Sequence, residues 1–319
     1  MQQTIKIGTR GSPLALVQAR HVKELLIKAH DDLSDQSIEI KVIKTSGDLI
    51  LDRHLMNAGG KGLFTKEIEE ALLAGDIDCA VHSSKDMPTR LPKGLCLTVF
   101  LPREDPRDAF VSPKFSHFLD LPKHAVLGTA SLRRRAQALR LRPDLKVTTF
   151  RGNVQTRLRK LADGEADATF LALAGLNRLG MTSAATEKLS LDDFLPAPAQ
   201  GAVTVEVREG DTEINQRLSP LHCSKTALEV TAERAYLSAL DGSCRTPIAA
   251  HAAVRQDEIL MHAQLLSLDG QQLFERHESC NANSNAAETM GADMGAQIRD
   301  EAGAAFFAAL AEEVEAEFE

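Results

Sequence analysis

The chain has 319 residues, of which 43% are hydrophobic and 26% charged, and its formal net charge is −8. This composition is typical of two or three packed domains and excludes a disordered chain. No apolar run approaches the roughly 20 residues of a membrane-spanning helix, so an integral membrane protein is excluded as well.

The cysteines and the amino-terminal segment favour a cytoplasmic protein. The five cysteines form no CxxC pair and are odd in number, which favours a reducing compartment and gives no spacing of metal ligands. Residues 1–12 contain neither the basic leader nor the apolar stretch of an export signal. The absence of Trp and the single Tyr leave few surfaces for stacking bases. We therefore expect no metal site, no nucleic-acid partner and no membrane partner.

The first elements in chain order form a β-α-β unit. Residues 4–9 alternate apolar and polar side chains and predict a strand, and a helix follows with Ser12 as N-cap and Pro13 as its first residue. Residues 38–45 predict a second strand, and two strands joined through a helix imply a parallel sheet. A long loop then leads to a helix near residues 65–74, a strand over 78–84 and a turn.

The middle of the chain repeats this order. Residues 125–140 match residues 6–20 as strand, Gly-Thr and helix, residues 145–153 match 38–48, and residues 160–175 match 71–86. A chance match of two β-α-β units is the alternative, but three matching junctions in the same order favour a repeat. We therefore expect two doubly wound α/β lobes, and a strand over 203–208 that could return to the first lobe.

The last hundred residues follow a different pattern. Residues 224–240 predict a helix, residues 251–279 predict hairpin-linked strands with turns at Gln256-Asp257 and Asp269-Gly270, and an Ala- and Glu-rich helix ends the chain. This pattern is typical of an α+β domain. The expected domains are a discontinuous first lobe (1–101 and 202–219), a second lobe (107–195) and a C-terminal domain (224–319).

The charge is unevenly distributed along the chain. Between Ser131 and Lys160 there are ten basic residues and one acid, Asp144, within a protein that is acidic overall. A local excess of this size is unfavourable through self-repulsion unless anions bind there. We therefore expect this segment to face an anionic ligand.

Hydroxyl groups and cations follow almost every predicted strand. Ligands of open parallel sheets lie beyond the carboxyl ends of the strands, where the N–H groups that begin each helix attract anions. Guanidinium groups bind carboxylates through two parallel hydrogen bonds. Because the chain has no GxxxxGK[ST] phosphate loop and no GxGxxG after a strand, the pattern favours a discrete polycarboxylate or polyphosphate ligand over nucleic acid.

Individual residues at these junctions leave alternatives open. Asp86 is either a turn or cap residue or a carboxylate that stabilises a cationic intermediate. Lys61 and Phe64 lie on a Gly-rich loop that is either a lid or an ordinary surface loop. Cys244, in a small-residue turn beside Arg245, is either a reactive thiol or an inert one.

Nine segments in consistent order resemble the porphobilinogen deaminase (hydroxymethylbilane synthase) family. They are GTRGSPLAL, GGKGLFTKEIE, AVHSSKDMPT, EDPRDAFVS, GTASLRRRAQ, RGNVQTRL, LALAGLNRLG, PAPAQGA and ERAYLSALDGSCRTPIA. The agreement runs from about Ile5 to Ile248, whereas the tail beyond Ala250 matches only in general pattern. The sequence departs from the family at Ser243, where Gly is usual before the cysteine, and at Arg245 and Thr246, which follow the cysteine. This departure concerns the geometry of the loop around Cys244.

The resemblance implies two periplasmic-binding-protein-like (type II) lobes and a C-terminal α+β domain that carries a dipyrromethane cofactor on Cys244. It implies Asp86 as the catalytic carboxylate and Lys61 and Phe64 as parts of a mobile loop. The implied cofactor-binding residues are Ser83, Lys85, Asp86, Thr129, Ser131, Arg133, Arg134, Asn153 and Arg157. The implied substrate-binding residues are Arg10, Ser12, Arg151, Arg157, Arg178 and Gln200.

The implied activity is that of a transferase of tetrapyrrole and heme biosynthesis. It condenses four porphobilinogen molecules head to tail on the dipyrromethane primer, with loss of ammonia, and then releases hydroxymethylbilane by hydrolysis. The family expectation is a monomer. The alternative from another class is a two-lobed binding protein for a polyanionic small molecule, against which the missing export signal, the third domain and Cys244 all argue.

Overall fold

The computed structural model describes residues 4–46, 65–241 and 246–316. Its contacts divide the chain into two compact units, Met1–Glu104 with Ala202–Ala227 and Asp105–Gly201 with Leu228–Glu319. Within the described residues, none of the helices combines the length and apolar composition needed to cross a bilayer. The expected division into three domains stays a proposal, and the two units are described separately below.

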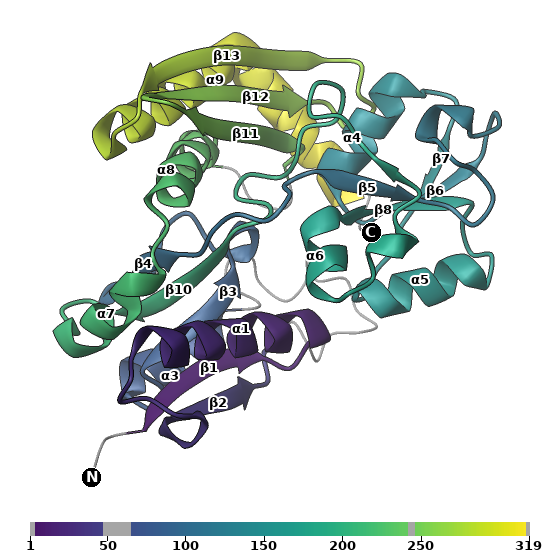
Figure 1. Cartoon of the computed structure of the whole chain (residues 1–319). Helices are drawn as coiled ribbons and strands as arrows, with labels where there is room; N and C mark the ends of the chain where they lie inside the picture. Colours follow the sequence, from purple (N-terminus) through teal and green to yellow (C-terminus); the bar gives the residue numbers. More distant parts are fainter. Residues whose placement is uncertain (1–3, 47–64, 242–245, 317–319) are drawn as a thin grey trace. The chain divides into compact units, whose positions relative to one another are not determined.

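The first unit is built on a five-stranded sheet in the order β2-β1-β3-β10-β4 (Figure 1). Its strands are β1 (Ile5–Arg10), β2 (Ile38–Ile43), β3 (Cys79–Ser83), β4 (Leu95–Phe100) and β10 (Val203–Arg208). β1, β2 and β3 run parallel, as the β-α-β pattern predicted, and β10 is antiparallel to its neighbours. The predicted strand at 203–208 therefore does return to the first sheet.

Helices cover both faces of this first sheet. The helices of the unit are α1 (Pro13–Ala29), α3 (Lys66–Ala74) and α7 (Thr212–Leu218), and α8 (Ser224–Ala239) begins in it. Val22 and Leu26 of α1 and Ile214 of α7 pack in one core, and Ile68 and Leu72 of α3 pack in another. Apolar positions three and four apart on α1 thus form its buried face, as expected of an amphipathic helix.

The second unit contains a sheet of the same design, in the order β7-β6-β8-β5-β9. Its strands are β5 (Asp108–Val111), β6 (Val126–Gly128), β7 (Lys146–Thr148), β8 (Ala168–Ala172) and β9 (Glu187–Lys188), and its helices are α4 (Leu132–Leu141), α5 (Val154–Ala162) and α6 (Leu173–Arg178). The parallel strands β6, β7 and β8 correspond to β1, β2 and β3, and antiparallel β5 takes the place of β10. The predicted internal repeat is confirmed by this correspondence.

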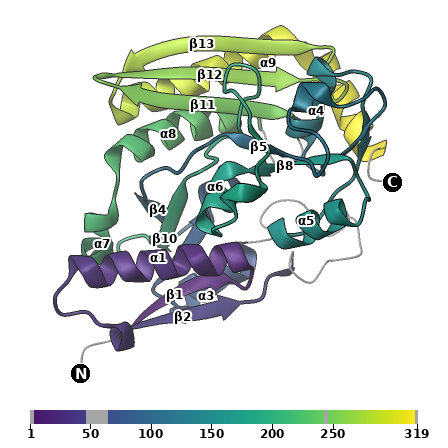
Figure 2. The same ribbon diagram turned by 45° about the vertical axis from the view of Figure 1, so that its right-hand side comes forward.

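The C-terminal part of the second unit is a three-stranded antiparallel sheet with helices on one face (Figure 2). It consists of β11 (Ile248–Arg255), β12 (Glu258–Leu266), β13 (Leu273–Asn281) and α9 (Ser284–Ala316). The turns fall at Gln256, with φ of 54°, and at Gly270, with φ of 72°, as predicted. Two doubly wound lobes and an α+β C-terminal domain confirm the predicted fold class.

Candidate active site

In the first unit, three predicted residues lie at the carboxyl edge of the sheet. Arg10 ends β1, Ser12 follows it, and Ser83 ends β3. The parallel register pairs Gly8 with Ala80, so β1 and β3 end at the same edge. The Ser12 hydroxyl accepts a hydrogen bond from the backbone N–H of Ala15 at 3.3 Å and caps α1, as predicted.

Ser83 is held by a residue that the sequence did not single out. Gln18, buried on α1, contacts the Ser83 hydroxyl with both ends of its amide, at 3.0 Å from Nε2 and 3.2 Å from Oε1. A buried amide fixed in this way orients the hydroxyl at the end of β3. Nothing in the apolar periodicity of α1 distinguishes Gln18, because its partner is 65 residues away.

Lys85 and Asp86 are exposed on the short 3₁₀ turn that follows β3. The backbone of this turn is fixed, since Ser84 N–H donates to the carbonyl of Ala202 at 3.0 Å and Met87 N–H donates to that of Ser84 at 3.2 Å. Ser84 itself is buried at 1% exposure. The turn therefore presents one cation and one carboxylate to solvent at the edge where Arg10 and Ser12 lie.

In the second unit, Thr129 and Ser131 follow β6 in the same way. Thr129 N–H donates to the carbonyl of Thr148 on β7 at 2.9 Å, and its hydroxyl accepts from Ser131 N–H at 3.2 Å. The Ser131 hydroxyl accepts from Arg134 N–H and caps α4. Gly128 allows this close packing, because a Cβ there would lie 2.6 Å from the Phe150 ring.

Arg133 and Arg134, on the first turn of α4, bind a buried carboxylate. Each is 5% exposed, and Asp108 at the start of β5 is completely buried. Arg133 donates through Nη2 to Asp108 Oδ2 at 2.7 Å, and Arg134 donates through Nη2 to Oδ1 at 2.6 Å. Backbone carbonyls of Leu195 and Phe170 accept from the other ends of the two guanidinium groups. We call Asp108, Arg133 and Arg134 the Asp108 cluster.

The electrostatics of this cluster favour charged groups in spite of burial. Burial alone would raise the pKa of Asp108, but the charges and hydrogen bonds of Arg133 and Arg134 outweigh it and hold the pKa well below its ordinary value. Burial also lowers the pKa of Arg133, and Asp108 opposes that effect. Two cations and one anion leave a net positive charge on the cluster.

A chain of contacts leads from Asp108 to the C-terminal part of the same unit. Gln200 donates through Nε2 to Asp108 Oδ1 at 3.0 Å and to the carbonyl of Pro106 at 2.8 Å. Its neighbour Ala199 has a φ of 62°, which is uncommon for a residue with a Cβ. The buried Glu233 of α8 accepts hydrogen bonds from the N–H groups of Ala199 and Ala252. Glu233 thus fixes the segment that positions Gln200.

The remaining predicted residues lie around α5 and α6. The Asn153 side chain accepts from Thr156 N–H at 2.8 Å and caps α5, and Arg157 Nε donates to the carbonyl of Gly152 at 2.8 Å. Arg151 is half-buried just before that cap. Arg178, at the end of α6, donates to the carbonyl of Gly201 at 2.7 Å. The neighbouring residues Gln200 and Gly201 therefore contact Asp108 and Arg178, respectively.

The basic segment between Ser131 and Lys160 is more balanced in space than in sequence. Arg142 pairs with Asp144, and Lys160 lies 3.4 Å from Glu165. Asp108, which precedes the segment by more than twenty residues, neutralises part of its first cluster. Local and long-range acids therefore pair with several of these cations, and the expectation that the segment faces an anionic ligand stays a prediction.

Some predicted residues lie outside the described part of the chain. These are the proposed cofactor attachment residue and the two residues of the Gly-rich loop, Cys244, Lys61 and Phe64. Asp108, Gln18 and Glu233 are the residues that sequence reasoning missed. The signal for Asp108 was present in the EDPRDAFVS segment, but its role depends on a pairing across the second sheet that chain order does not reveal.

The fold and these groups define a class of protein. Each of the two α/β lobes carries hydroxyl, amide and guanidinium groups at the carboxyl ends of its parallel strands, and the first also presents an exposed carboxylate. Such groups suit a small ligand with several carboxylates. The class is therefore a two-lobed α/β protein for a polyacidic small molecule.

Comparison with known proteins identifies the family. Residues 5–216 match the family model described as porphobilinogen deaminase, dipyromethane cofactor binding domain, and residues 227–300 match porphobilinogen deaminase, C-terminal domain. Relatives named porphobilinogen deaminase are 55% identical over 305 residues in Nitrobacter hamburgensis, with 96% of each chain covered, and 52% identical over 306 residues in Paracoccus denitrificans, with 96% of this chain and 97% of the other covered. The chain belongs to the porphobilinogen deaminase family.

Solved structures of binding proteins are similar at a lower level. A nutrient binding protein from Burkholderia cenocepacia bound to methionine has a TM-score of 0.41 and 18% identity, covering 68% of this chain and 90% of the other. The aliphatic sulphonate binding protein SsuA from Escherichia coli has a TM-score of 0.40 and 15% identity, covering 76% and 71%. TM-scores of this size do not decide the fold, which rests on the sheet topology described above.

Proposed function

We propose that the chain is a porphobilinogen deaminase, which condenses four porphobilinogen molecules with loss of ammonia and releases hydroxymethylbilane. The observation that carries this proposal is the match of both family domains, in order, over residues 5–216 and 227–300. The exposed Asp86 at the end of β3 supports it, because the reaction needs a carboxylate among cations. The binding-protein alternative is not favoured, since residues 227–300 match the C-terminal domain of the enzyme family.

The described residues fit a dipyrromethane cofactor. Each of its two rings carries an acetate and a propionate, so the group brings four carboxylates. The strand ends offer hydroxyl groups and cations to such a ligand, and, within the described part of the chain, the buried Nε of Arg133 lacks a hydrogen-bond acceptor. A buried donor without an acceptor indicates a missing partner. We propose that Ser83, Lys85, Thr129, Ser131, Arg133, Arg134, Asn153 and Arg157 hold the cofactor.

When bound, the cofactor supplies the nucleophilic pyrrole carbon to which the first substrate is joined. We propose Cys244 as the residue that holds it through a thioether, and the chain's other residues position the reactants. Arg10, Ser12, Arg151, Arg157, Arg178 and Gln200 would bind the carboxylates of incoming substrate. Lys61 and Phe64 would belong to the loop that closes over it.

We assign to Asp86 the stabilisation of positive charge on the substrate. As the C–N bond of the aminomethyl substituent of porphobilinogen breaks and its nitrogen leaves as ammonia, the electron pair of the pyrrole nitrogen delocalises toward the methylene carbon that remains on the ring. A carboxylate that accepts a hydrogen bond from the pyrrole N–H stabilises that charge, whereas Lys85 and the arginines alone would disfavour it. The fixed backbone of the Ser84–Asp86 turn keeps the carboxylate in place.

We also propose that the enzyme is cytoplasmic and monomeric and that its small-molecule partner is porphobilinogen. The cysteine content supports a reducing compartment. Size-exclusion chromatography with light scattering measures the oligomeric state directly, and a mass near 34.6 kDa is expected.

Intact-protein mass spectrometry of the purified holoenzyme tests the proposal. We expect a mass excess of two pyrrole units on the wild-type chain and none on Cys244→Ser. Cys280→Ser is the matched control, because Cys280 lies on β13 as a free cysteine and should leave the mass excess unchanged. An active wild-type enzyme of unmodified mass would exclude the covalent cofactor.

A further inference from the structure

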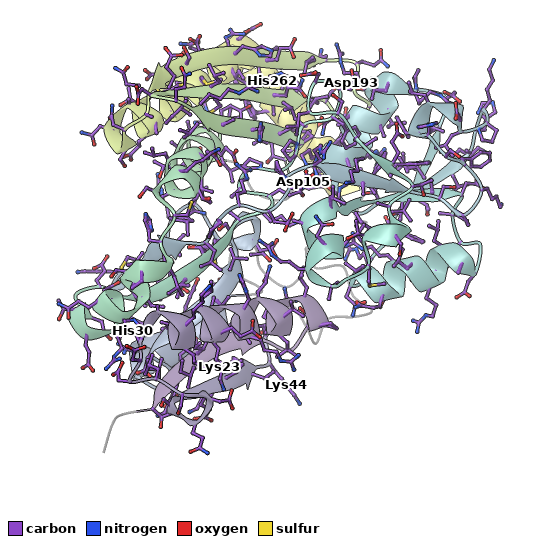
Figure 3. All side chains as sticks on the ribbon, in the orientation of Figure 1. Lys23, His30, Lys44, Asp105, Asp193 and His262 are labelled. Carbon is purple, nitrogen blue, oxygen red and sulfur yellow. The ribbon has the colours of Figure 1, made fainter. Side chains whose placement is uncertain are left out.

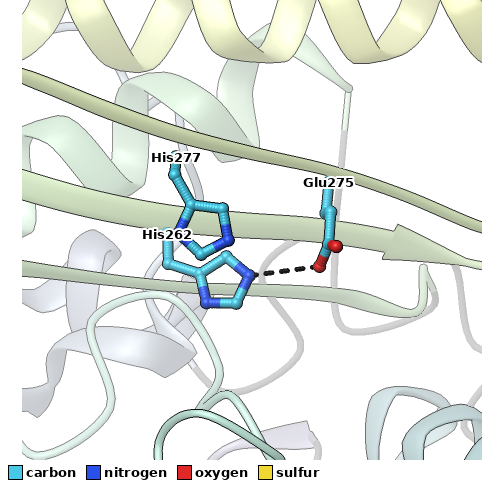
Figure 4. Close-up of side chains that lie close together, drawn as sticks. All are labelled: His262, Glu275 and His277. Carbon is cyan, nitrogen blue, oxygen red and sulfur yellow. Dashed lines mark hydrogen bonds and ion pairs between the residues drawn. The ribbon is translucent and has the colours of Figure 1, made fainter.

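Three side chains that could ligate a metal gather on the C-terminal sheet, and none of them is among the residues assigned to the reaction. They are His262 on β12 and Glu275 and His277 on β13, and their ligand atoms all lie within 4.8 Å of one another (Figure 4). Figure 3 shows His262 on this sheet among the other side chains. Among the described residues, His262, Glu275 and His277 form a group of potential metal ligands with this spacing.

The register of the sheet builds the group from residues far apart in sequence. His262 lies directly opposite His277, and Gln264 lies directly opposite Glu275. Directly opposed side chains of an antiparallel pair project from the same face and come within contact distance. The imidazole rings are stacked with their centroids 3.8 Å apart and an interplanar angle of 23°.

The group lies on the face of the sheet opposite the helices. Along β12, Met261, Ala263 and Leu265 pack into the core with α8 and α9, and the residues between them point the other way. The His262 side chain is 17% exposed and that of Glu275 45% exposed. An ion from solvent can therefore reach the group without opening the core.

Two potential ligand atoms of this group and the amide nitrogen of Gln264 lie within hydrogen-bond distance of one another. His262 Nε2 lies 3.4 Å from Glu275 Oε2, and the amide nitrogen of Gln264 lies 3.3 Å from the first and 3.1 Å from the second.

We propose that His262, Glu275 and His277 bind a divalent transition-metal ion of the Zn²⁺ type, which links β12 to β13. Tetrahedral ligands at about 2.0–2.1 Å from zinc lie about 3.3 Å from each other, close to the His262–Glu275 separation. Rotation of the exposed His277 brings in the third ligand. Rotation of the Gln264 amide replaces its N–H₂ group by the carbonyl oxygen and so removes a competing donor.

The donor set determines the class of ion. Two imidazoles and one carboxylate suit Zn²⁺, Co²⁺ or Ni²⁺, whereas Mg²⁺ and Ca²⁺ prefer oxygen ligands alone. Asp192 adds negative charge near His262 and favours a cation there. Three protein ligands leave a fourth position for water. We expect ion binding to stabilise the β12–β13 hairpin, because the ion binds the folded state and not the unfolded chain.

Isothermal titration calorimetry of the full-length holoenzyme without a polyhistidine tag tests the site, with Zn²⁺, Co²⁺ and Mg²⁺ as probes. We expect one Zn²⁺ per chain, no Mg²⁺ binding, and a Co²⁺ spectrum without a sulfur-to-metal charge-transfer band. His262→Ala and His277→Ala should each weaken Zn²⁺ binding by about tenfold or more. Gln264→Glu should strengthen it, because it adds a carboxylate opposite Glu275.

The matched control is His117→Ala. His117 Nδ1 lies 3.3 Å from Glu187 Oε1, so it forms an exposed His–Glu pair of the same separation but without a third ligand, and its loss should not change Zn²⁺ binding. Zn²⁺ should also raise the melting temperature of the wild type and of His117→Ala but not of His262→Ala. Equal Zn²⁺ affinity in wild type and the His262→Ala/His277→Ala double variant, or no Zn²⁺ binding at all, would overturn the site and leave the proposed enzyme activity untouched.

Discussion

Asp86 differs from the other carboxylates of the first unit in its setting. It is exposed on a fixed turn beside Lys85, at the edge where the parallel strands end. Carboxylates such as Asp78 instead accept hydrogen bonds from backbone and so stabilise the fold. The setting of Asp86 is consistent with a role in the reaction and predicts little effect of its charge on folding.

Asp86→Asn should lower turnover by about 10²-fold or more while the protein still folds and carries its cofactor, because the amide keeps the shape but loses the charge that stabilises the cation. Steady-state assay of product formation, together with the intact mass, measures both properties. Asp76→Asn removes another exposed carboxylate of the same unit and should leave turnover unchanged. Normal turnover by Asp86→Asn would remove Asp86 from the mechanism.

Asp108 balances the charge of two buried guanidinium groups. With Asp108→Asn, Arg133 and Arg134 keep their charges while the only carboxylate between them is lost. Loss of one partner from a buried ion pair typically costs about 3–5 kcal/mol of folding free energy. We expect a loss of that order in urea unfolding, together with impaired cofactor assembly, and a much smaller change for Asp144→Asn, whose partner Arg142 is nearer the surface.

The same cluster predicts the direction of a pH effect on stability. Because the two arginines lower the pKa of Asp108, its contribution is complete above the ordinary aspartate pKa of about 3.9. That contribution is lost as the pH falls further toward the folded-state pKa. The stability difference between wild type and Asp108→Asn should therefore be constant between pH 7 and about 5 and should shrink below about pH 4.

At the scale of elements, the junctions between strands and helices combine two roles. Ser12, Ser131 and Asn153 each cap the helix that follows a strand, and each is also a proposed ligand-binding residue. The cap side chain satisfies one of the free N–H groups that begin the helix, and the others can donate to an anion. Loss of such a residue should therefore affect stability and binding together.

Asn153→Ala and Asn283→Ala separate these two roles. Both residues cap a helix by accepting from an N–H three residues later, at 2.8 Å for Asn153 and 2.9 Å for Asn283. Each substitution should lower stability by about 1 kcal/mol. In a steady-state assay, only Asn153→Ala should also raise KM or impair chain growth. Identical kinetics for the two variants would show that Asn153 is a cap alone.

At the scale of the whole molecule, the second unit unites its α/β lobe with the C-terminal domain. Glu233, completely buried on α8, accepts from Ala252 on β11 and from Ala199 in the segment that carries Gln200. This single carboxylate joins elements of both parts. It is one of the contacts that group residues 105–201 with 228–319, although each part has its own apolar core.

Glu233→Gln should destabilise the second unit by about 1–3 kcal/mol, because one carboxylate oxygen is replaced by an N–H₂ group that faces a backbone donor. Hydrogen exchange should show faster exchange at the amides of Ala199 and Ala252. Glu278→Gln, at an exposed residue of β13, is the control and should change neither amide. Unchanged protection of both amides in Glu233→Gln would contradict this role.

Much of the fold could be predicted from the sequence because it depends on near neighbours. The 3.6-residue period of α1, the caps at Ser12 and Ser131, the turns at Gln256 and Gly270 and the repeat of the two lobes are all local patterns. The junction residues follow from them, because strand ends of a parallel sheet share an edge. The order of nine segments then indicated the family.

Only the tertiary structure decided which side chains meet. Asp108 binds Arg133 and Arg134, Gln18 binds Ser83, and His262 faces His277, through strand order, helix packing and cross-strand register. Charges and spacings along the chain predicted an anionic ligand near the basic segment and no metal site, because they do not include these contacts. Charge balance and metal geometry depend on distances between residues remote in sequence, and folding alone sets those distances.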